Sequence, residues 1–315
     1  MQQYIARRLI YVLLVLLGVT LVIFLLMRVV PGDIVSLITG DASVSDEDVE
    51  ALRHELGLDK PLYEQYLTWI WGVVRLDLGE SLWSERPVVD DVIERFPLTL
   101  QLAIMITGFT IILAIPLGIV CAIRQDTWLD YFLRIFSIAG LSLPSFWLGV
   151  LVILFLVLWF RWMPPLEYTS ILDDPSRNLQ QMIWPALTAG YRHVAVVSRM
   201  TRSCMLEVLR EDYIRTAWSK GLRERTVIYR HAMKNALIPV VTLLGMEFAF
   251  VFGAMVVTET VFSLPGFGSL LVDSIFHRDY PAIQATVLIF ATVVVLANVA
   301  VDIVYGWLDP RIRYS

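Results

Sequence analysis

Phe96–Ile123 reads FPLTLQLAIMITGFTIILAIPLGIVCAI and carries no charged residue over 28 positions. An α-helix needs roughly 20 residues to cross a hydrocarbon core about 30 Å thick, so this stretch is long enough to span a membrane. Three further uncharged runs are of comparable length: Leu9–Met27, Ile135–Phe160 and Ala282–Val301. The whole chain is 57% hydrophobic and only 17% charged, against about 25% charged in soluble domains. The sequence therefore predicts an all-α membrane protein.

Two further spans are predicted from less uniform stretches. Asn235–Thr258 is apolar except for Glu247, and Gln181–Met200 is interrupted by Arg192 and His193. Without the span at Gln181–Met200, the basic segments of the chain would fall on opposite sides of the membrane. Six spans place both ends of the chain on the same side.

The distribution of Lys and Arg assigns the two sides. Fifteen of these residues lie on the short segments of the side that holds both termini, and three lie on the short segments of the other side. Because short cytosolic segments are enriched in Lys and Arg, both termini are predicted to be cytosolic. Residues 31–97 then form a long extracytoplasmic loop with 15 Asp and Glu and five Lys and Arg. No linker or repeat divides the chain, so residues 1–315 are interpreted as a single membrane domain.

A basic segment lies between the fourth and fifth predicted spans. Arg199–Pro239 reads RMTRSCMLEVLREDYIRTAWSKGLRERTVIYRHAMKNALIP, with nine Lys and Arg against four Asp and Glu. Asp212–Gly221 is predicted to be a short helix that Gly221 ends, and Arg223–Lys234 a second, basic helix. A short helix outside the membrane can fit a groove of a soluble partner, and a basic loop can equally contact anionic lipid headgroups. The residues alone leave both interpretations open.

Two other features also leave alternatives open. Leu62–Val74 mixes tyrosine and tryptophan with aliphatic residues, a composition typical of the membrane–water boundary. This helix can pack on the chain's own spans or dock an external partner. Pro116 and Pro144 lie inside predicted spans, where proline kinks a helix and serves either ordinary packing or a hinge.

The sequence lacks the common catalytic and metal-binding motifs. It has no Gly-x-x-x-x-Gly-Lys-Ser/Thr phosphate loop and no Gly-x-Ser-x-Gly elbow, and its four histidines are scattered. The two cysteines do not indicate a disulfide framework. We therefore expect no catalytic residue, metal site or cofactor in this chain, and any energy for uphill transport would come from another subunit.

Several motifs resemble the permeases of ATP-binding cassette importers. Glu211–Gly221 resembles the EAA loop of these proteins, and Met200–Ser203, Met205–Ala217 and Asn235–Pro239 resemble the dipeptide/oligopeptide/nickel class. Further motifs of that class lie along almost the whole chain: Pro31-Gly-Asp33, Glu55–Pro61, Asp77-Leu-Gly79, Phe96-Pro97, Phe146-Trp147, Thr258–Ser263, Pro265-Gly266, Arg278–Pro281 and Asp309–Arg313. The long loop after the first span resembles the B-type permease of such importers.

The resemblance implies a six-span permease subunit of type I importer architecture in the bacterial inner membrane. It implies a second related permease, two ATPase subunits that bind ATP and Mg, and an extracytoplasmic solute-binding protein that delivers the cargo. Di- and oligopeptides are the expected cargo. Similar permeases carry nickel complexes, glutathione or oligosaccharides, and these stay open as alternatives. Outside this class, the alternatives are a membrane scaffold and an ion-coupled carrier, although the spans hold few acidic residues for coupling an ion.

The resemblance also places a coupling helix in the cytosolic loop 199–234. The residues expected to couple to the ATPase are Asp212, Tyr213, Ile214, Arg215, Thr216, Ala217, Lys220 and Gly221. Trp218 stands where smaller or basic residues are commoner, and it would add a bulky contact to the partner.

Glu247 is the main acidic residue inside a predicted span. A carboxyl group at mid-membrane is costly and by default marks a pathway or a paired site. We expect Glu247, with Phe248 and Phe252, to face the translocation path and to favour cargo with a cationic group. The alternative is that Glu247 is protonated, or paired against a neighbouring helix.

Overall fold

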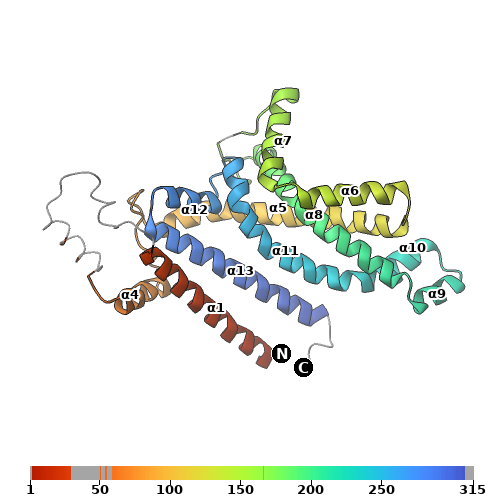
Figure 1. Ribbon diagram of the computed structural model, residues 1–315, viewed down its shortest axis with the longest axis horizontal. Helices are drawn as coiled ribbons and strands as arrows, with labels where there is room; N and C mark the ends of the chain where they lie inside the picture. The colour runs from red at the N-terminus through yellow and green to blue at the C-terminus, as the bar shows by residue number, and fades with distance from the viewer. Residues whose placement is uncertain (1, 30–49, 51–53, 55–58, 166, 309–315) are drawn as a thin grey trace. The chain divides into compact units, whose positions relative to one another are not determined.

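The computed structural model describes residues 2–29, 50, 54, 59–165 and 167–308 (Figure 1). Within these residues every regular element is a helix, and one isolated β-bridge pairs Glu80 with Pro87. The Pro31-Gly-Asp33 motif and most of Glu55–Pro61 lie outside the described residues. The chain separates into two compact units, residues 1–97 with 265–295 and residues 98–264 with 296–315.

Four of the predicted spans lie in helices that are long and apolar enough to cross a membrane. These helices are α1 (Gln2–Val29), α5 (Val88–Ile123), α11 (Met233–Val261, with the helical turns before it) and α13 (Tyr280–Leu308). Helix α5 continues through Pro97 and Pro116 without a break. The sequence therefore located these helices correctly, because only a helix of this length satisfies its backbone groups inside lipid.

The predicted span Ile135–Phe160 is not one helix. Helices α6 (Trp128–Ser142) and α7 (Ser145–Phe160) meet at Leu143-Pro144 with a bend of 108° (Figure 1). Leu143 is extended, with φ −88° and ψ 127°, because the proline ring disfavours a helical conformation in the residue before it. The proline that was predicted to kink this span therefore breaks it into two helices, and the segment is a broken span or a re-entrant pair.

Helix α8 (Pro175–Val208) contains the predicted span Gln181–Met200. Asp174 caps it by accepting the N–H groups of Ser176 and Arg177, each at 3.0 Å, and Pro175 occupies the first turn. Its composition is more polar than that of the four apolar helices. Many of its residues are buried, because α8 packs against α6, α7 and α11. Its 34 residues give a length of about 51 Å, ample to cross a bilayer, and its role as a span stays a prediction.

In the first unit, the aromatic helix α4 (Leu62–Val74) packs on α1. The rings of Tyr66 and Trp69 contact the Phe24 ring, with centroids 5.4 Å and 6.2 Å away. The hydroxyls of Tyr66 and Thr20 are 3.0 Å apart. This face of α4 therefore serves the chain's own packing, while Tyr63 and Trp71 stay exposed.

Two motifs that are distant in sequence meet in the same unit. The Ser81 hydroxyl donates to the Asp279 carboxylate at 2.5 Å, and Asp279 also accepts the Ala282 N–H at the start of α13. Gly79, with φ +84°, lies against Pro281. The loop that leaves α12 (Phe267–Phe276) is thus fastened to residues 77–87.

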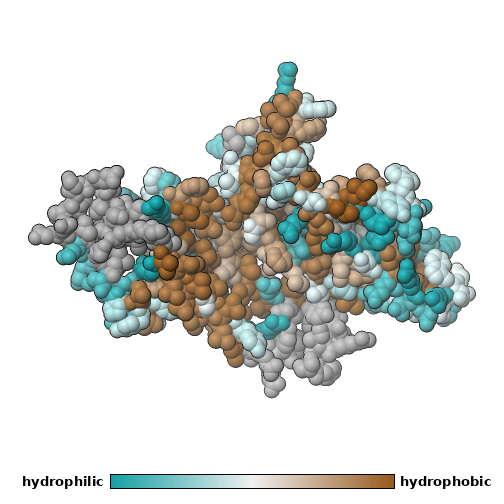
Figure 2. All heavy atoms as spheres, viewed as in Figure 1, coloured by the Kyte–Doolittle hydropathy of each residue, from teal (hydrophilic) through white to brown (hydrophobic). Residues whose placement is uncertain are grey.

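In the second unit, the buried core joins α5, α8, α11 and the helical segments between α8 and α11. Gly118 of α5 allows a close approach to Thr201 of α8, since a Cβ at Gly118 would lie 2.5 Å from the Thr201 Cβ. Figure 2 shows hydrophobic residues over α7 and hydrophilic residues over α9 (Asp212–Ser219) and α10 (Glu224–Thr226). This is the pattern expected when α9 lies outside the apolar layer.

Candidate functional site

Helix α9 is a short, well-bounded element. Asp212 lies in its first turn, where a carboxylate interacts favourably with the helix dipole. The helix ends at Ser219, and Gly221 follows with a φ of +72°, in the left-handed region that glycine adopts without strain. The Gly221 N–H donates to the Trp218 carbonyl at 2.9 Å. The prediction of a short helix closed by Gly221 is confirmed.

One face of α9 is buried in the core of the second unit. Ile214 and Ala217 are buried in the same apolar cluster as Cys204 and Met205 of α8. The π-helical segment η1 (Val227–Ala232) supplies the other wall of this cluster. Ile214 and Ala217 therefore anchor α9 and do not present their side chains to a partner. Their expected part in coupling to the ATPase stays a prediction.

The opposite face of α9 is exposed. It carries Tyr213, Arg215, Thr216, Trp218, Ser219 and Lys220. Arg215 pairs with Asp212 at 3.2 Å, and both side chains are exposed, so the pair contributes about 0.5 kcal/mol at most. The Tyr213 hydroxyl accepts from Asn235 Nδ2 at 2.9 Å, which ties α9 to α11. The outward face thus offers charge and aromatic surface on a helix that is fixed from behind.

The predicted second basic helix, Arg223–Lys234, is not a separate element. Helix α10, η1 and α11 form one helical run from Glu224 to Val261, 38 residues long. The prediction of a helix here is confirmed from Glu224 on, and because no proline or glycine lies between Arg223 and Lys234, this helix continues directly into the fifth predicted span. Since η1 also packs on α9, a displacement of α9 would act on α8 and α11 together.

Glu247 on α11 is paired with His193 on α8. A carboxylate oxygen lies 2.5 Å from His193 Nδ1, and the two side chains are 14% and 4% exposed. Thr107 and Thr110 of α5 line the small space beside the pair. In the sequence His193 was only an interruption of an apolar run, so its role was missed. The pairing could have been suggested from the sequence, because His193 and Glu247 are polar residues inside two neighbouring predicted spans.

The other predicted path residues are enclosed to different extents. Phe252 is buried, and its ring meets the half-buried Phe248 edge-on, with centroids 5.4 Å apart. Phe248 also lines a cavity of about 270 Å³ with Gly245 and Val301. That these residues face the path stays a prediction. The pairing of Glu247 with His193 favours the alternative role, a polar link between helices.

A second buried acid was also missed. Glu259 of α11 is fully buried and accepts a hydrogen bond from the Thr99 hydroxyl at 2.6 Å. In the sequence it appeared only as part of the Thr258–Ser263 motif. Among the described residues, no group of three or more His, Cys, Asp or Glu side chains could hold a metal ion.

Comparison with known proteins assigns the chain to a family. The family described as binding-protein-dependent transport system inner membrane component matches residues 114–314, and its N-terminal companion matches residues 1–103. A putative peptide transport system permease protein of Brucella abortus is 41% identical over 315 residues, covering 100% of both chains. The dipeptide transport system permease protein DppB of Escherichia coli is 39% identical over 338 residues, again covering 100% of both. The di/tripeptide transport system permease protein DppB of Pseudomonas aeruginosa is 39% identical over 335 residues, with the same coverage.

These matches confirm the resemblance drawn from the sequence motifs, and they extend over the full length of the chain. The helical architecture, with several helices apolar enough to cross a bilayer, agrees with a multi-pass protein of the inner membrane. The chain therefore belongs to the binding-protein-dependent transport system inner membrane component family, as a permease subunit of an ATP-binding cassette importer of the dipeptide/oligopeptide/nickel class.

Proposed function

We propose that this chain forms, with a second related permease, the translocation path for di- and oligopeptides. An extracytoplasmic solute-binding protein delivers the peptide, and two ATPase subunits bind ATP and Mg on the cytosolic side. The peptide cargo is supported by relatives named as peptide permeases that match the chain from end to end. The excess of Lys and Arg near the termini and around α9 supports a cytosolic location for these segments.

The observation that carries the proposal is the construction of α9. On its inner face, Ile214 and Ala217 are buried in one cluster with residues of α8 and η1. Its outer face is exposed and can contact another protein. A helix built in this way can transmit a push from a partner without first rearranging. We assign the exposed residues Tyr213, Arg215, Thr216, Trp218 and Lys220 to the ATPase contact.

The packing of α9 against its neighbouring helices indicates how the transport step would proceed. Closure of the ATPases around ATP would displace α9, and the packed cluster would move the adjoining ends of α8 and α11 with it. Deeper in the same unit, the His193–Glu247 pair joins these two helices again. We infer that α8 and α11 move as one body while the path opens to the outside. No covalent chemistry takes place in this chain, because ATP is hydrolysed by the partner subunits.

Reconstitution with the partner permease, the ATPases and the binding protein tests the proposal. We expect uptake of labelled dipeptide into proteoliposomes that requires both ATP and the binding protein. Arg215→Glu should abolish co-purification of the ATPases, because it reverses a charge on the outer face of α9. Arg75→Glu, an exposed arginine at the end of α4 in the predicted extracytoplasmic loop, is the matched control and should retain them.

Two results would overturn parts of this proposal. Uptake of a nickel complex, glutathione or an oligosaccharide without uptake of peptide would replace the cargo and leave the coupling mechanism standing. Uptake that proceeds without ATP, or ATPases that stay bound to the Arg215→Glu protein and still drive uptake at the original rate, would remove the coupling role of α9.

A further inference from the structure

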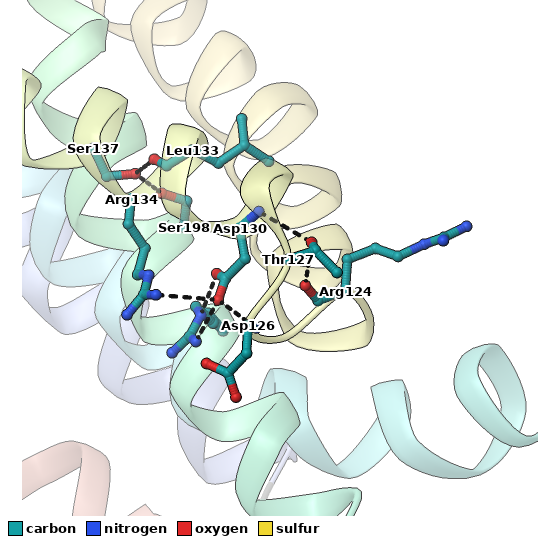
Figure 3. A network of polar contacts seen from close by, with 9 residues as sticks. Arg124, Asp126, Thr127, Asp130, Leu133, Arg134, Ser137 and Ser198 are labelled. Carbon is teal, nitrogen blue, oxygen red and sulfur yellow. Dashed lines mark hydrogen bonds and ion pairs between the residues drawn. The ribbon is translucent and has the colours of Figure 1, made fainter.

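A buried ionic cluster joins the start of α6 to α8. Asp130 is fully buried and accepts from Arg202 Nε and Nη2, both at 2.9 Å, while Arg134 Nη2 lies 3.5 Å away (Figure 3). Asp130 also accepts the backbone N–H of Asp126 at 3.2 Å. Thr127 caps α6 by accepting the Asp130 N–H. The position of Asp130 and its two arginines is thus fixed by several independent contacts.

A cavity of about 210 Å³ opens beside this cluster. It is lined by three arginines, by two serines whose hydroxyls are 3.2 Å apart, and by three apolar residues: Arg134, Arg199, Arg202, Ser137, Ser198, Cys121, Ile138 and Leu141. Arg134 Nε is buried, and it has no hydrogen-bond partner among the described residues. A buried donor without a partner, on an arginine that lines a cavity together with two other arginines, indicates a ligand that accepts hydrogen bonds.

The cluster holds more positive than negative charge. The three arginines face one buried carboxylate, Asp130, and one exposed carboxylate, Asp126, which lies near enough to act on Arg202. Arg199 forms no ion pair within the described part of the chain. A bound anion would balance this excess. The planar fork of a guanidinium fits a phosphate group better than it fits a monatomic ion.

The level of the cavity in the membrane indicates the source of that phosphate. Arg134 immediately precedes the apolar run that begins at Ile135, and Arg199 lies at the end of the predicted span in α8. In the predicted topology, both therefore lie where the apolar layer gives way to headgroups. Ile135 and Ile138 of α6 are exposed next to the arginines and offer apolar surface for an acyl chain. Basic pockets between membrane helices at this level bind lipid headgroups.

We propose that this arginine cavity, lined by Arg134, Arg199 and Arg202, binds the phosphate of an anionic phospholipid in the leaflet at that end of α6 and α8. The bound headgroup completes the hydrogen bonds of Arg134 and Arg199, and its acyl chains lie along α6. Because Arg202 is two residues from Cys204, which packs in the cluster that anchors α9, the lipid would also steady the part of α8 that supports α9.

Native mass spectrometry of the complete purified transporter tests this site. The probes are phosphatidylglycerol, phosphatidylcholine and inorganic phosphate, each titrated separately, and inorganic phosphate is also used as a competitor of bound phosphatidylglycerol. We expect phosphatidylglycerol to bind more tightly than phosphatidylcholine. Arg199→Gln should weaken phosphatidylglycerol about fivefold, the effect of one arginine near an anionic surface. Arg192→Gln removes an exposed arginine of α8 that does not line the cavity, and it should leave the affinity unchanged.

Arg134→Gln is a second variant that removes the unpaired donor, and co-purification of the ATPases shows that each variant is assembled. Unchanged phosphatidylglycerol affinity in both Arg199→Gln and Arg134→Gln would overturn the site. An equal loss of phosphatidylglycerol affinity in Arg192→Gln would also overturn the site, because the lipid would then be attracted by the general positive charge of the surface. Displacement of the lipid by inorganic phosphate at equal concentration would overturn the lipid assignment, since the cavity would then be a free-phosphate site.

Discussion

Nδ1 of His193 on α8 lies 2.5 Å from a carboxylate oxygen of Glu247 on α11, with both side chains largely enclosed. These two helices also flank the cluster that anchors α9. The pair is therefore a polar link between the same two helices that a displacement of α9 would move. Since removal of one partner leaves the other polar group buried and unpaired, each residue depends on the other.

The first prediction concerns the strength of this link. Glu247→Ala and His193→Ala should each destabilise the transporter by about 3 kcal/mol, the typical loss when one member of a buried pair is removed. The double variant should lose clearly less stability than the sum of the losses of the two single variants, since no unpaired group remains. The measurement is thermal unfolding of the purified complex in detergent. Strictly additive losses would show that the two residues act independently.

Glu247→Gln separates a structural role from a role in cargo selection. The amide can still meet His193 but carries no charge, so a purely structural link predicts a similar reduction in uptake for every peptide. A carboxylate that faces the path predicts a selective loss for peptides with an added lysine. We expect the uniform reduction, because His193 already occupies the carboxylate. The check is competitive uptake of a lysine-containing and a neutral dipeptide, and a selective loss above tenfold would restore the path assignment.

Close packing between α5 and α8 gives a prediction with a matched control on one helix. A Cβ at Gly118 would lie 2.5 Å from Thr201 Cβ and 2.6 Å from the Ser198 carbonyl oxygen, and one at Gly108 would meet no atom within 4 Å. Gly118→Ala should therefore destabilise the protein by about 1–3 kcal/mol through overpacking. Gly108→Ala should be neutral or stabilising by up to about 1 kcal/mol, since alanine favours a helix. Equal unfolding midpoints for the two variants would contradict the packing of α5 on α8.

The ionic cluster on α6 gives a fourth prediction. Asp130→Asn leaves Arg202 and Arg134 without their counter-charge, and it should destabilise the protein by about 3 kcal/mol. Asp126→Asn is the control, because the Asp126 carboxylate is exposed and its charge is screened by solvent, while the backbone N–H that donates to Asp130 is unchanged. Its free energy of unfolding should stay within about 0.5 kcal/mol of that of the original protein. A much smaller loss of stability in Asp130→Asn would contradict this prediction and would mean that the cluster is solvated.

Much of the fold could be predicted from local sequence. Runs such as Phe96–Ile123 had to be helices, because an apolar segment of that length has no other way to satisfy its backbone in lipid. The end of α9 at Gly221 followed from the left-handed conformation that glycine tolerates. Both inferences depend on residues that are close together in the chain.

The other features of the fold and the site could not be predicted from the sequence, because they depend on how the helices pack against one another. Pro144 predicted a disturbed helix, but the angle of 108° could not be read from it, because both α6 and α7 also pack on α8, which is distant in sequence. The pairing of His193 with Glu247 requires the depth and rotation of two helices whose residues are 54 positions apart. The inward position of Ile214 likewise depends on η1, whose continuity with α11 was not predicted.

Cross-linking from α9 tests the central claim most directly, that the exposed face of this helix engages the ATPases. The native Cys121 and Cys204 are both buried, so a photoactivatable maleimide will react with an introduced surface cysteine. Ser219→Cys places the probe on α9, and Ser84→Cys places it on an exposed serine of the predicted extracytoplasmic loop. We predict an adduct with the ATPase subunit from Ser219→Cys and none from Ser84→Cys. Absence of that adduct in a transporter that still takes up peptide, or labelling of Ser219→Cys by an impermeant reagent from outside intact cells, would contradict the account.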